Sequence, residues 1–350
     1  MDFLITFGIA LVLGIILYKL KVPGGMMVGA ILGAAAFNIF TGRADMPDVS
    51  KFIAQVIAGA FIGSGMSKND LNRLPKLFKP ILILLFNLLV LNIVMGIVIW
   101  KISSLDIITS LMSVVPGGMS DIPLIAEDMG ANAGVVATLQ FVRMTVGIGI
   151  FPTFIQKFDM RFSSDNPNKP FEKETRENIK VKKREYNWIH LGLTLFVAFL
   201  GGYIGKRLGV PAGTLSFSMF AVLILKLTTG IGNLTIEMKR FAQLLSGTYI
   251  GSGIGLKDVL MLKELLIPVI LIVVGYMANC IWTGAILNKV FKIERKEAML
   301  AATPAGASDM ALISSDIGVV SVDLIVMQII RMIFVIAVFP QVITLVVNLF

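Results

Sequence analysis

Two short segments of the chain place a carboxylate directly after a run of helix-breaking residues. Residues 116–121 read PGGMSD and residues 304–309 read PAGASD. Proline removes a backbone donor and glycine favours turns, so each run should interrupt a helix. A helix that starts at Ser120 would point its free N–H groups and the positive end of its dipole at the interruption, which favours an anionic group of a solute. The residues that we expect to bind a solute at the interruptions are Gly117, Gly118, Ser120, Gly306 and Ser308.

The carboxylates of Asp121 and Asp309 have two interpretations. Each could cap the helix that follows it, by accepting hydrogen bonds from the first backbone N–H groups. Within a membrane, however, a carboxylate is costly and usually handles an ion or a proton. The second interpretation makes Asp121 and Asp309 candidate sites for a coupling Na⁺ or H⁺.

An arginine and a glutamine follow each interruption on one face of the next helix. Gln140 precedes Arg143 by three positions, and Gln328 precedes Arg331 by the same spacing. An arginine inside a membrane is normally paired and faces the protein interior. Arg143 therefore either forms a permanent ion pair with Asp121, Glu127 or Asp128, or holds the carboxylate of a solute. Both pairs are candidate solute-binding residues.

Small residues form a third duplicated motif, because residues 63–65 and 251–253 both read GSG. Such residues most often allow close packing of helices in membranes. The alternative is that the hydroxyl groups of Ser64 and Ser252 line a cavity and contact a solute.

The composition places these motifs in a membrane protein. Of the 350 residues, 56% are hydrophobic and only 15% are charged, against about 25% charged in soluble domains. The mean hydropathy is +0.86, and the apolar residues form runs of about 16 to 25, which suit helices that cross a bilayer. The formal charge of +9 fits basic cytoplasmic loops, so we expect the lipid bilayer and no nucleic acid as a partner.

The chain contains one unit twice. When the sequence is shifted by 188 positions against itself, it aligns without a gap, with Gln55 on Gln243 and Asp128 on Asp316. We therefore divide the chain into a first membrane repeat (1–157), a charged cytoplasmic linker (158–188) and a second membrane repeat (189–350). In the first repeat we expect helices at 3–20, 24–40, 51–66 and 78–101, half-helices at about 105–115 and 119–130, and a last helix at 133–157.

Basic residues indicate how the repeats are oriented, because Lys and Arg collect on the cytoplasmic side. The basic segments 68–79 and 289–296 lie on the same side as the linker only if each half-helix pair re-enters the membrane. Each repeat then has about five crossings, and an odd number inverts the second repeat relative to the first. The predicted fold is an all-α polytopic membrane protein with two inverted repeats, each of about five transmembrane helices plus a broken re-entrant helix pair.

The doubled motif resembles the AbrB-type duplicated membrane protein family. The resemblance rests on the P-G/A-G-x-S-D segments and the Q-x-x-R helices after them, and it covers both repeats but not the linker. It implies a multi-pass protein of the bacterial plasma (inner) membrane. Members are labelled either as ammonia monooxygenases or as AbrB family transcriptional regulators. Ala305 replaces Gly117 and Ser315 replaces Glu127 in the second repeat, so the two interruptions need not share one role.

Both family labels meet an obstacle in the composition. One His and one Cys cannot supply a copper centre, and the Glu-x-x-His pairs of a di-iron site do not occur. We expect no metal, no cofactor and no enzymatic activity. We also expect no soluble DNA-binding domain, so any regulation of gene expression would be indirect.

The function predicted from these features is secondary active transport. The expected substrate is a small organic anion or zwitterion, coupled to Na⁺ or H⁺ and bound at the broken helices between the repeats. No ATP-binding motif of the GxxxxGK[ST] type occurs. A membrane-embedded regulator and a passive channel are the alternatives, and a homodimer is compatible with the pattern.

Overall fold

The structure is a computed structural model that describes residues 2–22, 24–151, 153–155, 157, 188–304 and 321–349. The predicted linker, apart from its last residue, lies outside the described residues. The second interruption also lies outside them, with Gly306, Ser308 and Asp309. The regular elements in the described ranges are all helices, as the sequence predicts.

The helices fall into two sets whose boundaries recur at a spacing of 188 residues. Gly25–Thr41 and Gly213–Thr229 correspond at both ends, as do Ile107–Val114 and Arg295–Ala302. The first set consists of α1 (Asp2–Lys19), α2 (Gly25–Thr41), α3 (Asp48–Gly63), α4 (Lys68–Ile102), α5 (Ile107–Val114), α6 (Ile122–Asp128) and α7 (Ala133–Gly149). The second set consists of α9 (Trp188–Arg207), α10 (Gly213–Thr229), α11 (Ile236–Gly253), α12 (Leu256–Met261), η1 (Leu262–Leu265), α13 (Leu266–Phe291), α14 (Arg295–Ala302) and α16 (Val322–Val347).

Five helical stretches in the described ranges are long and apolar enough to cross a membrane, namely α1, α4, α9, α13 with part of η1, and α16. Helices α2, α7 and α10 are apolar but shorter. A bilayer core requires about 20 apolar residues from a helix that crosses it alone. The described helices are therefore consistent with a multi-pass membrane protein.

The start of α4 differs from the prediction. A basic loop was expected up to residue 78, but the helix already begins at Lys68. Ser67 and Asp70 form a capping box, in which the backbone N–H of Ser67 donates to Asp70 Oδ2 at 2.7 Å. This cap satisfies donors that the first helical turn would leave free. The cap explains a helix start well before Pro75 and Pro80, which both lie inside α4.

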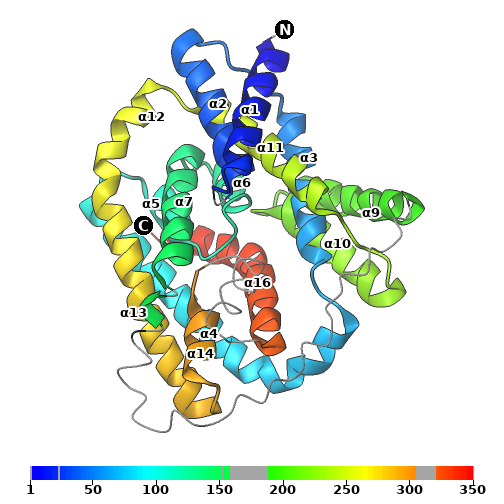
Figure 1. Ribbon diagram of the computed structural model, residues 1–350, viewed down its shortest axis with the longest axis vertical. Coiled ribbons are helices and arrows are strands. Elements are labelled where there is room, and N and C mark those ends of the chain that lie inside the picture. Colours follow the sequence, from blue (N-terminus) through cyan, green and yellow to red (C-terminus); the bar gives the residue numbers. More distant parts are fainter. Residues whose placement is uncertain are drawn as a thin grey trace.

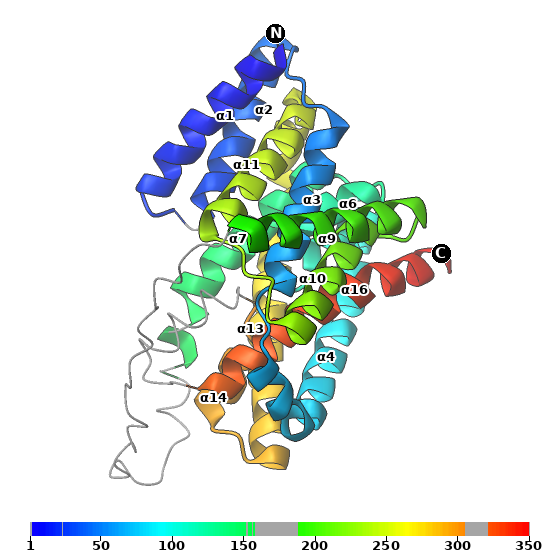
Figure 2. The same ribbon diagram turned by 90° about the vertical axis from the view of Figure 1, so that its right-hand side faces the viewer.

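The helices pack into two bundles, and each bundle contains helices from both sets. In the first bundle α1 packs on α2, α2 on α11, α11 on α3, α3 on α10, and α10 on α9. In the second bundle α4 packs on α5, α13 and α16, while α7 contacts α5 and α6. Figure 1 shows α1 and α2 at the end that carries the N-terminus and α14 at the opposite end, and Figure 2 gives the view turned by 90°. The largest apolar core lies mainly in the second bundle.

Glycines bring the two sets of helices into close contact within the first bundle. Gly59 and Gly63 of α3 lie against the α10 backbone, at Leu215 and Met219 respectively. Because the contacts advance in the same direction along both helices, α3 and α10 run parallel. The packing interpretation of the GSG motif is confirmed for Gly63.

The equivalent contact joins α11 to α2. Gly247 and Gly251 of α11 lie against the α2 backbone, at Met27 and Ile31. These contacts also advance together, so α11 runs parallel to α2. Small residues allow this approach because no side chain separates the two backbones.

We expect Gly251→Ala to destabilise the protein by about 1–3 kcal/mol, because its new methyl group would overlap the carbonyl oxygen of Ile31. Gly253→Ala is the matched control on the same helix, since a Cβ there meets nothing within 4 Å. Thermal unfolding of both purified variants in detergent measures the difference. Equal unfolding midpoints would contradict the close contact between α11 and α2.

Candidate functional site

The first predicted interruption lies between the end of α5 and the start of α6. Its glycines are required by close approaches within the segment. A Cβ at Gly117 would collide with the Ile122 side chain, and a Cβ at Gly118 would collide with the carboxylate of Asp121. The glycines therefore let the chain fold tightly at this point.

Gln140 and Arg143 of α7 bind the carbonyl groups that the interruption leaves free. Gln140 Nε2 donates to the carbonyl oxygen of Val115 at 3.0 Å, and Arg143 Nη1 donates to the same oxygen. Arg143 Nη2 donates to the carbonyl oxygen of Gly117 at 2.7 Å. The guanidinium group also lies at the negative end of the α5 dipole, where a positive charge is favourable.

The ion-pair interpretation of Arg143 is wrong in the described part of the chain. No described carboxylate lies within ion-pair distance of its guanidinium group, although Arg143 is only 3% exposed. Its charge is instead surrounded by carbonyl oxygens and by the ring of Tyr276, whose centre lies 5.6 Å away. Asp121 therefore forms no ion pair with Arg143.

Gln328 and Arg331 of α16 repeat this arrangement. Gln328 Nε2 donates to the carbonyl oxygen of Leu300 at 3.0 Å, and Arg331 Nη1 donates to that of Thr303 at 2.6 Å. These oxygens belong to the end of α14, which is the counterpart of α5. Each Gln–Arg pair therefore holds the end of one short helix.

Asp121 is buried at the start of α6, with 6% exposure. It occupies the N-cap position, but its side chain accepts no capping hydrogen bond. The carboxylate turns back toward Gly118 and interacts with Ser120, and the positive charge that acts on it is that of Lys239. The simple capping interpretation is therefore wrong for Asp121.

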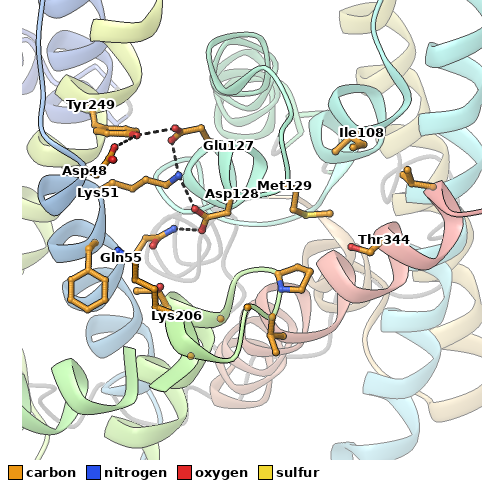
Figure 3. A pocket seen from close by; sticks show the side chains of 18 of the residues that line it. Asp48, Lys51, Gln55, Ile108, Glu127, Asp128, Met129, Lys206, Tyr249 and Thr344 are labelled. Atoms are coloured by element: carbon orange, nitrogen blue, oxygen red, sulfur yellow. Dashed lines mark hydrogen bonds and ion pairs between the residues drawn. The ribbon is translucent and has the colours of Figure 1, made fainter. Parts of the chain in front are cut away.

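A cavity of about 700 Å³, the main cavity, lies between the two bundles. It is bounded by the first turns of α3 and α10, by the ends of α6, α9 and α16, and by α11, so both sets of helices contribute (Figure 3). Sites for small molecules commonly measure about 300–1,000 Å³. The lining residues are Asp48, Lys51, Phe52, Gln55, Ile108, Glu127, Asp128, Met129, Gly205, Lys206, Gly209, Val210, Pro211, Gly213, Thr214, Tyr249, Thr344, Val347 and Asn348.

Lys51 forms the centre of the charged wall of this cavity. Its Nζ lies 2.7 Å from Asp128 Oδ1 and 3.0 Å from Glu127 Oε2. The other oxygen of Asp128 accepts a hydrogen bond from Gln55 Nε2 at 2.5 Å. The carboxylates thus lie at fixed positions around one ammonium group (Figure 3).

Tyr249 completes the charged wall from α11. Its hydroxyl oxygen lies 2.9 Å from Glu127 Oε1 and 3.0 Å from Asp48 Oδ1. Within the described ranges, no group of three or more His, Cys, Asp or Glu side chains is placed to hold a metal ion. We call this set of side chains the Lys51 cluster, which consists of Asp48, Lys51, Gln55, Glu127, Asp128 and Tyr249.

Glu127 and Tyr249 also line a second cavity of about 370 Å³, the side cavity. Asn132 and Asp258 lie in its wall, joined by a hydrogen bond of 2.9 Å from Asn132 Nδ2 to Asp258 Oδ1. Ser252 lines it as well. The contact between Glu127 and Tyr249 therefore belongs to the walls of both cavities.

The structure places the predicted binding residues away from the main cavity. Ser252 lines the side cavity, whereas Asp121 lines neither cavity. Ser64 ends α3, where its carbonyl oxygen accepts a hydrogen bond from Lys226. The other described residues of the prediction that line neither cavity are Gly117, Gly118, Ser120, Gln140, Arg143, Gln328 and Arg331.

Sequence reasoning missed Lys51 and Gln55, although the repeat contained a signal for both. The same two residues recur as Lys239 and Gln243, 188 positions later. An acidic or basic residue kept in both copies of an apolar unit is a candidate for function.

The aromatic neighbours of these lysines correspond as well. Lys51 Nζ lies 5.6 Å from the ring centre of Tyr249, and Lys239 Nζ lies 5.1 Å from that of Phe61. Tyr249 and Phe61 occupy equivalent positions in the two repeats. The lysine–aromatic contact is thus duplicated, but only one of the rings carries a hydroxyl group.

Comparison with known proteins gives one family match and two relatives. The model of the family described as "Transition state regulatory protein AbrB" matches residues 26–347. YhjN of Bacillus subtilis (strain 168) is 25% identical over 299 residues, which are 82% of this chain and 76% of that protein. The protein named "Putative regulator AbrB" of Escherichia coli (strain K12) is 24% identical over 318 residues, which are 88% of this chain and 85% of that protein.

We expect Arg143→Leu to destabilise the fold by about 1–3 kcal/mol for each carbonyl group that it leaves unsatisfied. Arg143→Lys keeps the charge and a donor, so it should lose less. Thermal unfolding in detergent compares the two, with Arg43→Leu on an exposed loop as the control. An Arg143→Leu protein as stable as the wild type would show that these hydrogen bonds are not needed.

Proposed function

Since the chain belongs to the AbrB family and has helices long enough to cross a membrane, we propose that it is a secondary active transporter of a small charged solute. The observation that carries this proposal is the main cavity, which lies between two bundles and has a charged wall. Movement of one bundle against the other would open such a cavity to alternate sides of a membrane. The proposed location is the plasma membrane of a bacterium.

Helix directions support an inverted relation between the repeats. Helix α2 runs parallel to α11, and α3 runs parallel to α10. Tyr249 near the end of α11 contacts Asp48 at the start of α3, and Lys239 near the start of α11 lies over the ring of Phe61 near the end of α3, so these two helices are antiparallel. Helix α10 therefore runs opposite to α2, its counterpart in the first repeat. Inverted repeats of this kind are common in secondary transporters.

The side chains at the opposite end of the molecule support the same topology. Arg73 Nη1 and Lys76 Nζ lie 2.6 and 3.5 Å from the carboxylate of Asp323, which joins the start of α4 to the start of α16. Ser321, just before α16, donates to Glu297 of α14. The basic segments 68–79 and 289–296 thus meet at one end, as cytoplasmic segments should.

Asp121 is our candidate for the coupling residue. Its carboxylate is buried and has no capping role, and it lies at the interruption between α5 and α6 rather than in the main cavity. A carboxylate in this position can bind Na⁺ or H⁺ while the solute occupies a separate place. The equivalent Asp309 is proposed on sequence grounds alone.

The charges of the main cavity favour a zwitterion over a simple organic anion. Its wall contains the carboxylates of Asp48, Glu127 and Asp128 and the ammonium groups of Lys51 and Lys206. Both signs of charge are therefore available to a bound solute. An organic anion alone would face an excess of carboxylates.

The name of the Escherichia coli relative favours a second candidate function, a membrane-embedded regulator. Such a protein could bind the same solute and affect gene expression indirectly. Solute binding without gradient-driven flux would favour this alternative, and flux without coupling to either cation would favour a passive channel.

We expect purified protein in proteoliposomes to move a solute from a broad metabolite panel when a Na⁺ or pH gradient is imposed. Asp121→Asn should fold normally but lose the gradient-driven flux, because the amide cannot carry the coupling cation. Accumulation of labelled solutes in the vesicles measures this. Transport is refuted if neither gradient moves any solute, and full flux in the variant would remove Asp121 from coupling.

We also expect cysteines placed at Lys76 and Lys292 to react with a membrane-impermeant thiol reagent from the same, cytoplasmic side. A cysteine at Arg43, in the loop between α2 and α3, should react only from the other side. Cys280 is fully buried, so the native thiol should not interfere. Labelling of positions 76 and 292 from opposite sides would exclude the inverted topology.

A further inference from the structure

The charged wall of the main cavity forms a binding place for an ammonium group, and a side chain of the protein itself fills it. Lys51 Nζ lies between Asp128 Oδ1 and Glu127 Oε2, at 2.7 and 3.0 Å. The ring of Tyr249 faces the same ammonium group at 5.6 Å. Carboxylates together with an aromatic ring are the groups that bind ammonium ions in proteins.

Hydrogen bonds that do not involve Lys51 fix the positions of the carboxylates in this binding place. Gln55 donates to the second oxygen of Asp128, and the Tyr249 hydroxyl contacts both Glu127 and Asp48. Gln55 is only 2% exposed, so its amide is fixed by packing. The side chains of Glu127 and Asp128 are 31% and 28% exposed and line the main cavity, while Glu127 Oε2, which Lys51 contacts, is buried.

The charge of the wall also favours a positive group. The Lys51 cluster contains three carboxylates and one ammonium group, and two of the carboxylates, those of Glu127 and Asp128, contact Lys51 directly, which leaves an excess of negative charge. Lys206, elsewhere in the cavity wall, has no carboxylate within ion-pair distance in the described ranges; its Nζ lies 5.3 Å from the ring centre of Phe52. Lys206 is thus available for an anionic group at the other end of a solute.

The side of the cavity across from Lys51 is less polar. Figure 3 shows Ile108, Met129 and Thr344 there, facing the charged wall. A solute with one charged end and an apolar body would fit both sides of the cavity.

We propose that the main cavity binds small molecules that carry a primary amine. When no solute is bound, the ammonium group of Lys51 occupies the place that the amino group of the solute would take. On binding, the ammonium group of the solute replaces Lys51 between Glu127 and Asp128, and a carboxylate on the same solute pairs with Lys206. The inference rests on the proposed transport function for its biological meaning, but the binding preference is a property of the cavity alone.

Three probes that share the same branched five-carbon chain test this preference in the wild-type protein: isoamylamine, leucine and 4-methylpentanoate, which are a cation, a zwitterion and an anion. Ligand-dependent thermal stabilisation in detergent measures their affinity without any gradient. Isoamylamine and leucine should bind ~10- to 100-fold more tightly than 4-methylpentanoate, since only they form charge-assisted hydrogen bonds with the carboxylates. Failure of both amines to bind, or equal binding of the anion, overturns the inference.

Removal of the ammonium group of Lys51 provides a second test. Lys51→Ala should be less stable than the wild type, and ethylammonium chloride should restore its unfolding midpoint more than sodium chloride at the same concentration. Lys79→Ala, on the exposed start of α4, is the control and should respond equally to both salts. A Lys51→Ala protein that responds equally to both salts would make the Lys51 cluster a purely structural ion pair.

The two proposals can fail separately. If amines bind but no gradient drives flux in proteoliposomes, the charge preference stands and transport is wrong. If a gradient drives flux of solutes without an amino group while amines neither bind nor compete, transport stands and the role of Lys51 is wrong.

Discussion

The arrangement of the second bundle depends on one constraint, which is that the carbonyl groups at an interrupted helix must find donors away from water. Lipid offers none, so such backbone persists only when protein groups satisfy it. Arg143 and Gln140 provide these donors for the end of α5, and Arg331 and Gln328 provide them for the end of α14. Arg143 and Arg331, which look like parts of a ligand site in the sequence, therefore bind the backbone, and they fix α7 and α16 against the short helices.

Contacts between helices of different repeats explain why neither repeat forms a bundle alone. The glycine faces of α3 and α11 are shaped to receive α10 and α2, each from the other repeat. The short helices of both repeats gather in the second bundle. Because every bundle needs helices from both halves, the main cavity is formed where the two halves meet and not within either of them.

Much of the fold could be predicted from the sequence, because apolar length, helix breakers and duplication are local signals. The half-helix break at Pro116 and the α2 and α5 boundaries followed from them. The beginning of α4 did not, since the capping pair Ser67 and Asp70 outweighed two prolines. The cavity was harder still to predict. It depends on which distant turns meet, and Lys51 touches Glu127 only because α3 packs beside the end of α6. The usable clue was duplication, which pairs Lys51 with Lys239, Gln55 with Gln243 and Asp128 with Asp316.

That duplication is incomplete, because one copy lacks two of the carboxylates and the phenol hydroxyl of the Lys51 cluster. Tyr249 corresponds to Phe61, Asp48 to Ile236 and Glu127 to Ser315. Lys239 lies over its aromatic ring as Lys51 does, yet the corresponding positions of the sequence carry neither the tyrosine hydroxyl nor the carboxylates of Asp48 and Glu127. Under the transport function that we propose, the solute would therefore meet different chemical groups at the two symmetry-related positions, so its affinity would differ between the two faces of the membrane.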